Sequence, residues 1–206
     1  MTEEVRTHNI LYMQIVQSKS LTVFLLIFTI SGVSRTFLAS SWIFDFILYG
    51  SVYFIIYLLF IALANALHEK GHIKKLQELG YHAMNFQAHR IGDVSFSIEN
   101  IEKMSADEAY QVASAPFLLP TFYTIEFVSL LLLLGISILS PFPLDIILLA
   151  TTGLISVSFL GSLCALIVIQ KSLISGSCVW FARTVTSRGD LDDIVAWNRM
   201  KAIRRG

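Results

Sequence analysis

The stretch His68-Glu69-Lys70-Gly71-His72 lies at the end of a long apolar run, residues 42–67. That run is long enough to cross a bilayer, because about 20 residues suffice. Residues four apart on a helix lie on one face, with Cβ atoms about 5–6 Å apart. If the helix continues through the stretch, His68 and His72 can bind one metal ion together. Glu69 follows the first histidine directly, where its carboxylate can reach a metal-bound water without being a ligand.

The spacing of these residues is the H-E-x-x-H arrangement of zinc hydrolases. In that arrangement the two histidines bind zinc and the glutamate acts on a water molecule. Catalytic zinc usually has three protein ligands and one water. We therefore expect Zn²⁺ as the cofactor, and the third ligand must come from elsewhere in the chain.

The composition is that of an integral membrane protein. Of the 206 residues, 55% are hydrophobic and 15% are charged, and the mean hydropathy is +0.67. A typical soluble domain is about 25% charged. The net charge is zero, so the composition gives no reason to expect a nucleic-acid partner. The lipid bilayer is the expected surrounding.

The apolar runs predict a mostly α, polytopic membrane protein with four transmembrane helices, forming a single domain over 1–206. The spans are expected at about 20–39, 42–67, 117–140 and 144–169.

Polar segments separate and follow these spans. The insertion 76–116 is predicted to contain two short strands, 81–90 and 94–98, because apolar and polar residues alternate in the second. A capping box at Ser105 predicts the start of a helix. The segment 170–206 is expected to end in a polar helix that opens at Gly189-Asp190 and runs from Leu191 to about Ile203.

The basic residues predict the orientation. If the N-terminus is cytoplasmic, four spans place all 15 Lys and Arg residues except Arg35 on the cytoplasmic side. The positive-inside rule favours that arrangement, with both termini cytoplasmic. The H-E-K-G-H stretch then lies at the cytoplasmic end of the second span.

Two aspartates are candidates for the third metal ligand. Span counting places Asp190 on the side of the histidines and Asp145 roughly one bilayer thickness, about 30 Å, away. Asp190 is therefore favoured, although an aspartate there also suits the N-cap of the last helix. His8, His82 and His89 are expected to be ordinary tail or strand histidines.

Three further residues stand out but are not among the expected metal ligands. Glu126 lies within the third span, where an ionisable group is costly and often functional. It could support the metal site through hydrogen bonds rather than act directly. Cys164 and Cys178 fit neither a disulfide framework nor a zinc knuckle, and we expect them to be small core residues.

Over residues 42–193 the chain resembles the site-2-protease-like membrane zinc metallopeptidases, and more closely the small zincin membrane peptidases. The resemblance rests on His68-Glu69-Lys70-Gly71-His72, on Gly189-Asp190 and on Ala115-Pro116, which is similar to that group's Ala-Gly-Pro element. The chain departs from the group in lacking an Asn shortly after Pro116. Leu144-Asp145 is similar to a Leu-Asp-Gly carboxylate of such proteases, but no Gly follows it.

The resemblance implies a zinc-dependent membrane endopeptidase. It would hydrolyse peptide bonds of a membrane-associated protein or peptide near the cytoplasmic face. His68, His72 and Asp190 would bind the metal, and Glu69 would be the general base on a zinc-bound water. The predicted strands offer an edge to which an extended substrate could add.

Other functions remain open at this point. The main alternative is a catalytically inactive scaffold or regulatory subunit of the same fold. The intact His68, Glu69 and His72 argue against it, because a decayed site has no reason to keep all three. A zinc peptidase of another class would use a Glu as third ligand, and no Glu follows the fourth span.

Overall fold

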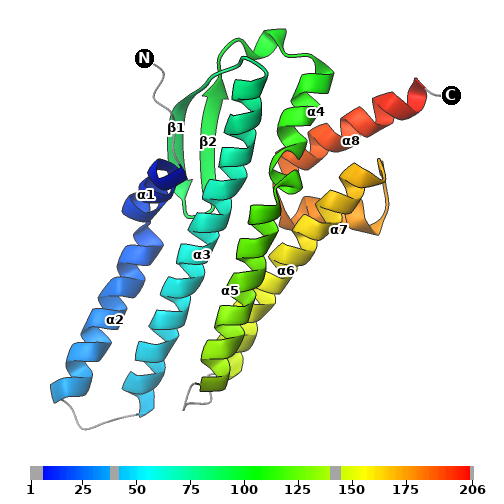
Figure 1. Cartoon of the computed structure of the whole chain (residues 1–206). Helices are drawn as coiled ribbons and strands as arrows, with labels where there is room; N and C mark the ends of the chain where they lie inside the picture. Colours follow the sequence, from blue (N-terminus) through cyan, green and yellow to red (C-terminus); the bar gives the residue numbers. More distant parts are fainter. Residues whose placement is uncertain (1–6, 38–41, 140–144, 205–206) are drawn as a thin grey trace. The chain divides into compact units, whose positions relative to one another are not determined.

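The computed structural model of the chain describes residues 7–37, 42–139 and 145–204 and is mostly helical (Figure 1). The helices are α1 (Thr7–Gln17), α2 (Lys19–Phe37), α3 (Trp42–Glu78), α4 (Ala106–Ser114), α5 (Pro120–Leu139), α6 (Asp145–Gln170), α7 (Ser177–Val185) and α8 (Arg188–Ile203). Two short 3₁₀ turns, η1 (Ile101–Lys103) and η2 (Pro116–Leu118), flank α4. The strands β1 (Ala83–Arg90) and β2 (Asp93–Ile98) pair as a two-stranded sheet.

Two helices are long and apolar enough to cross a membrane: α3 and the part Thr152–Gln170 of α6. The described parts of α1 and α2 pass the same test together but meet at a bend of 63°, so a third span is compatible with the structure. Pro120–Gly135 of α5 is a shorter apolar helix. These lengths and compositions agree with the predicted membrane protein, whereas the number of four spans stays a prediction. The predicted span ends at 38–39, 140 and 144 lie outside the described residues.

The chain divides into two compact units. The first comprises Met1–Ala66, Ala88–Val94 and Glu126–Ile155, and the second comprises Leu67–Gln87, Ser95–Ile125 and Ser156–Gly206. The prediction of a single domain is not tested by this division.

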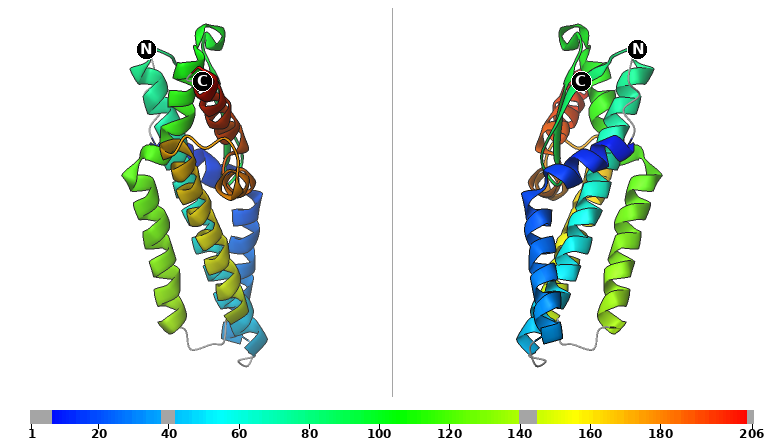
Figure 2. Two further views of the ribbon diagram at one scale, coloured as in Figure 1. Left: turned by 90° about the vertical axis from the view of Figure 1, so that its right-hand side faces the viewer. Right: turned by 90° about the vertical axis from the view of Figure 1, so that its left-hand side faces the viewer.

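In the first unit, parts of α2, α3, α5 and α6 form a helical layer (Figure 2). Tyr53, Leu133 and Ile155 form its buried apolar cluster, with one residue from each of α3, α5 and α6. Arg35 near the end of α2 lies 2.8 Å from the Asp45 carboxylate at the start of α3, so an ion pair joins the ends of these two helices.

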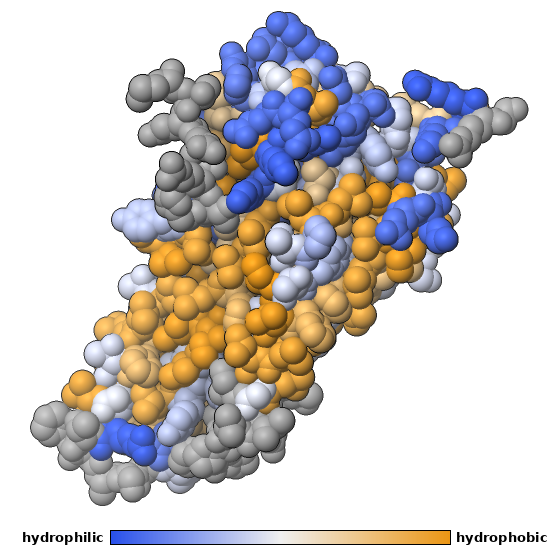
Figure 3. Space-filling model, in the orientation of Figure 1, coloured by the Kyte–Doolittle hydropathy of each residue, from blue (hydrophilic) through white to orange (hydrophobic). Residues whose placement is uncertain are grey.

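Large apolar side chains remain exposed along these helices, and Figure 3 shows them as a broad hydrophobic surface. Exposed apolar side chains in such numbers are typical of a surface that lipid covers. Among the described side chains of α5, the exposed large apolar residues are Phe127, Val128, Leu131, Leu132 and Leu134.

A buried glutamine connects α1 to its neighbours within the first unit. The side-chain amide of Gln14 donates to the Ala62 carbonyl at 3.2 Å, and its oxygen accepts from the Gly92 backbone N–H at 2.8 Å. Gly92 forms the hairpin turn with φ +78°, and a Cβ there would lie 2.7 Å from Ile61. The turn therefore requires glycine both for its backbone conformation and for space.

The second unit has its own core, made by α4, η2, α6, α7 and α8. The largest buried side chains of this cluster include Phe117, Leu191 and Ile194. Cys164 and Cys178 pack against the cluster, as expected for small core residues.

Asn198 fixes α8 to the end of α6. Its buried side-chain amide donates to the carbonyls of Leu173 at 2.9 Å and Val168 at 3.4 Å. The last carbonyls of a helix have no partner within that helix. Asn198 therefore binds one carbonyl in the last turn of α6 and one in the segment that follows it, and joins α8 to both.

Several sequence predictions are confirmed and some are wrong. The capping box at Ser105 is present, with both of its hydrogen bonds, and both strands form. The last helix, however, begins at Arg188 with Ser187 at the N-cap position, so the predicted start at Leu191, after Gly189-Asp190, is three residues too late. The sequence analysis also missed α7, whose nine residues lie between more polar segments.

Gly71 allows a close approach between α3 and η2. A Cβ on Gly71 would lie 2.8 Å from the Pro116 Cα atom and 3.1 Å from Leu119 Cδ1. A side chain at this position must therefore displace backbone. The backbone contact has no room for even one methyl group.

We expect Gly71→Ala to destabilise the protein by about 1–3 kcal/mol, the usual cost of overpacking. In an open helix position the same change stabilises by about 1 kcal/mol. Gly135→Ala is the matched control, because nothing lies within 4 Å of the Cβ it would add. The thermal unfolding midpoints of the two variant proteins in detergent, compared with that of the wild type, measure both stability changes. A Gly71→Ala protein as stable as the Gly135→Ala protein would contradict the close contact.

Candidate metal centre

Three predicted ligands lie together in the second unit. The Nε2 atom of His68 lies 3.0 Å from Oδ2 of Asp190, and the Nε2 atom of His72 lies 3.2 Å from the same oxygen. The two Nε2 atoms are 3.2 Å apart. Within the described part of the chain, this is the one group of three or more His, Cys, Asp and Glu residues close enough to hold an ion.

The helix α3 positions the two histidines. It runs without a break through the H-E-K-G-H stretch, so His68 and His72 stand one turn apart on one face. Their ring centroids are 4.8 Å apart and both residues are buried. The continuation of the helix beyond the apolar run agrees with the sequence prediction.

Asp190 comes from the first turn of α8. Because Ser187 occupies the N-cap position, the Asp190 carboxylate is not the N-cap, and its Oδ2 points to the histidines instead. Burial alone would raise the pKa of this carboxyl. The hydrogen bonds with His68 and His72 outweigh burial and hold the pKa far below its ordinary value, so Asp190 is ionised.

A backbone carbonyl decides which nitrogen of His72 carries a proton. Nδ1 of His72 lies 2.9 Å from the Val112 carbonyl oxygen, which can only accept, so Nδ1–H donates. In a neutral ring, Nε2 then carries a lone pair. That lone pair faces the ionised Asp190 oxygen at 3.2 Å, which is unfavourable unless a proton or a metal ion lies between them.

The donor set fits a zinc ion. Zinc bonds to His nitrogen and carboxylate oxygen are about 2.0–2.2 Å long, which places the ligand atoms of a tetrahedral ion about 3.3 Å apart. The three donor atoms are 3.0–3.2 Å apart. A single proton can bridge two of these atoms, whereas a cation can attract all three. Two imidazoles and one carboxylate are ligands that zinc accepts.

Aromatic rings surround the histidines. The ring of His68 lies 5.2 Å from that of Phe117 in an edge-to-face arrangement and 5.9 Å from that of Phe122. The ring of His72 lies 6.5 Å from that of Phe96 on β2. Such packing restricts the rotation of the imidazoles and lowers the access of water.

Glu69 is buried beside the two histidines in sequence. Its charge raises the pKa of His72, and it is not one of the three residues whose donor atoms converge. Its action on a water molecule stays a prediction.

The remaining candidates are not members of this cluster, or their side chains are not described. His82 and His89 are exposed. The side chains of His8 and Asp145 lie outside the described residues. Glu126 is buried within α5 and belongs to the first unit.

Some residues that build the site were missed by the sequence analysis. The Val112 carbonyl is a backbone group, so no residue type marks it. Phe117 and Asn198 look like ordinary members of an apolar run and a polar helix. The capping box that begins α4 is the signal nearest to Val112, and it fixes the helix that presents this carbonyl.

Comparison of the chain with models of protein families, with curated proteins and with solved structures gives no match.

We expect Asp190→Ala to lower zinc affinity by more than the factor of about 10–100 typical of outer-shell changes, because it removes a direct ligand. Asp193→Ala is the matched control, because Asp193 lies on the same helix, is exposed and is outside the cluster. Zinc content after dialysis against a graded chelator measures both. Equal zinc retention by the two variants would exclude Asp190 as a ligand.

Proposed function

We propose that the chain is a zinc-dependent membrane endopeptidase that hydrolyses peptide bonds of a membrane-associated protein or peptide near the cytoplasmic face. One observation carries the proposal. The Val112 carbonyl accepts from the Nδ1–H of His72, so that the Nε2 atom is the one that faces His68 and the ionised Asp190. Together with the H-E-x-x-H spacing, this arrangement favours a zinc hydrolase over an inactive scaffold.

The residues have distinct roles in this proposal. His68, His72 and Asp190 hold the ion. When bound, zinc lowers the pKa of a water ligand toward about 7 and polarises the scissile carbonyl. Glu69 accepts a proton from the attacking water on its carboxylate and passes it to the nitrogen of the leaving amine.

The position in the membrane is part of the proposal. The four spans are α2, the apolar part of α3, α5 and α6, and both termini are cytoplasmic. Support comes from the length of α5, 20 residues, which matches the number that a span needs, about 20. The basic residues support the orientation through the positive-inside rule. The site then lies at the cytoplasmic end of α3.

The hairpin is a suitable place for the substrate. A peptide bond within a helix is shielded by the helix's own hydrogen bonds, so a substrate must become extended before cleavage. A two-stranded sheet has edges to which an extended segment can add. The contact between Phe96 of β2 and the His72 ring supports delivery of such a segment to the metal centre.

Glu69→Gln is the direct test of catalysis. We expect the variant to keep its zinc and to lose about 10²–10⁴-fold in cleavage rate, because the amide cannot accept the proton. The assay uses liposomes that contain a panel of single-span peptides, each with a fluorophore and a quencher flanking the cytoplasmic end of its helix.

Glu78→Gln is the control, because Glu78 ends the same helix and pairs with Lys75 at 3.1 Å on the surface. This variant should cleave at the wild-type rate. Undiminished cleavage by Glu69→Gln would reject Glu69 as the base. Zinc-loaded wild-type protein that cleaves no peptide of the panel would favour the inactive scaffold.

A further inference from the structure

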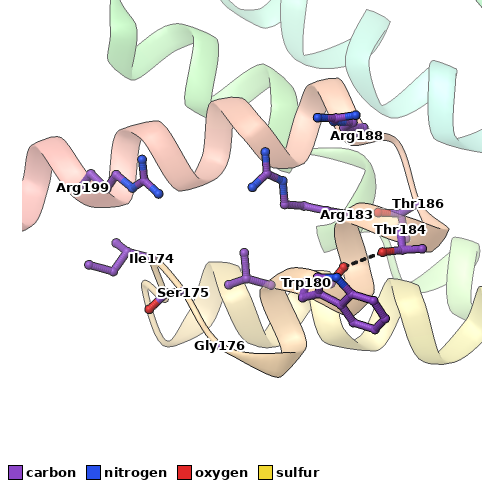
Figure 4. A pocket seen from close by; sticks show the side chains of 10 residues that line it. Ile174, Ser175, Gly176, Trp180, Arg183, Thr184, Thr186, Arg188 and Arg199 are labelled. Atoms are coloured by element: carbon purple, nitrogen blue, oxygen red, sulfur yellow. Dashed lines mark hydrogen bonds between the residues drawn. The ribbon is translucent and has the colours of Figure 1, made fainter.

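A second polar site lies away from the metal ligands, between α7 and α8 of the second unit. Its wall surrounds a hollow of about 780 Å³, which is within the range of small-molecule sites, about 300–1,000 Å³. Figure 4 shows three arginines along one side and Ile174 and Trp180 along the other. The hollow thus has one basic wall and one apolar wall.

The basic wall carries a net positive charge. Arg183 comes from α7, and Arg188 and Arg199 come from α8. The Asp192 carboxylate pairs with both Arg183 and Arg188, and its Oδ2 atom lies 3.8 Å from Nε of Arg188. Two of the three guanidinium groups thus share one carboxylate, and the wall keeps an excess of positive charge. Guanidinium groups bind phosphate oxygens through paired N–H donors.

The apolar wall is unusually exposed for its residue types. Trp180 is 68% exposed and Ile174 is 41% exposed. Tryptophan beside basic residues is typical of the membrane–water interface, because its ring is apolar and its N–H is polar. The two walls together match a molecule with a phosphate at one end and hydrocarbon at the other.

The chain position places the hollow near lipid headgroups. Ile174 comes four residues after Gln170, the end of the candidate span in α6. The 26 residues of α6 give a helix of about 39 Å, longer than the hydrocarbon core of about 30 Å and close to the full bilayer of about 40–45 Å. In the proposed topology, in which α6 is a span, its end at Gln170 reaches the membrane surface, with the hollow beside it.

We propose that this hollow binds the phosphate of an anionic phospholipid, with the arginines on the phosphate and with Trp180 and Ile174 against the acyl chains. The site is separate from the metal ligands and does not depend on the proposed peptidase activity. Bound lipid would hold α7 and α8 at the membrane surface, and α8 carries Asp190.

The test is lipid binding by the purified full-length protein in detergent, measured by native mass spectrometry. The probes are phosphatidylglycerol and phosphatidylcholine, each alone and with inorganic phosphate as competitor. We expect phosphatidylglycerol to bind more tightly than phosphatidylcholine. Arg199→Gln should lower the affinity for phosphatidylglycerol about fivefold, as the loss of one basic residue at a membrane surface does. The double variant Arg183→Gln/Arg199→Gln should lower this affinity further.

Lys201→Gln is the matched control, because it removes one charge from the same helix at an exposed residue outside the hollow. It should leave phosphatidylglycerol binding unchanged. Equal weakening by Arg199→Gln and Lys201→Gln would overturn the proposal in favour of general charge attraction. Equal affinity for the two lipids would overturn it, and so would full displacement of phosphatidylglycerol by millimolar phosphate, which would indicate a soluble anion as the ligand.

Discussion

The convergence of two imidazole nitrogens and one carboxylate oxygen, all within 3.2 Å of one another, is the constraint on which the rest of the second unit depends. Three electron-rich atoms at this spacing repel one another unless positive charge joins them. The protein must therefore hold two helices firmly in place. The buried core holds α8 against α4, and Asn198 ties it to the last turn of α6 and to the segment that follows. The Val112 carbonyl then sets the tautomer of His72.

Part of this site could be predicted from the sequence because it is local. His68 and His72 lie one helical turn apart, so their spacing alone indicates a shared face. The choice of Asp190 over Asp145 needed only the count of spans between each aspartate and the histidines. Whether Asp190 would cap the last helix could not be predicted, because Ser187 and Asp190 both suit the start of a helix. In the structure Ser187 occupies the N-cap position without a side-chain capping hydrogen bond, and the carboxylate of Asp190 contacts the histidines.

The contacts that support the site are long-range, and that is why the sequence did not reveal them. Nothing in the residue types of Gly71 and Pro116 indicates that they meet. In the structure, however, a Cβ on Gly71 would lie 2.8 Å from the Pro116 Cα atom. The two residues belong to separate elements of the family resemblance, and the fold brings them into one contact. The helix α7 was missed for a similar reason: its nine residues are stabilised by packing on α8 and on the core, and a helix this short is marginal alone.

X-ray absorption at the zinc edge of the purified protein tests directly whether His68, His72 and Asp190 bind one zinc ion. We expect one zinc per chain with four nitrogen or oxygen neighbours at about 2.0–2.2 Å. The multiple scattering should be that of two imidazoles. A sulfur shell at about 2.3 Å, which would point to cysteine ligands, or a spectrum without imidazole scattering would contradict it.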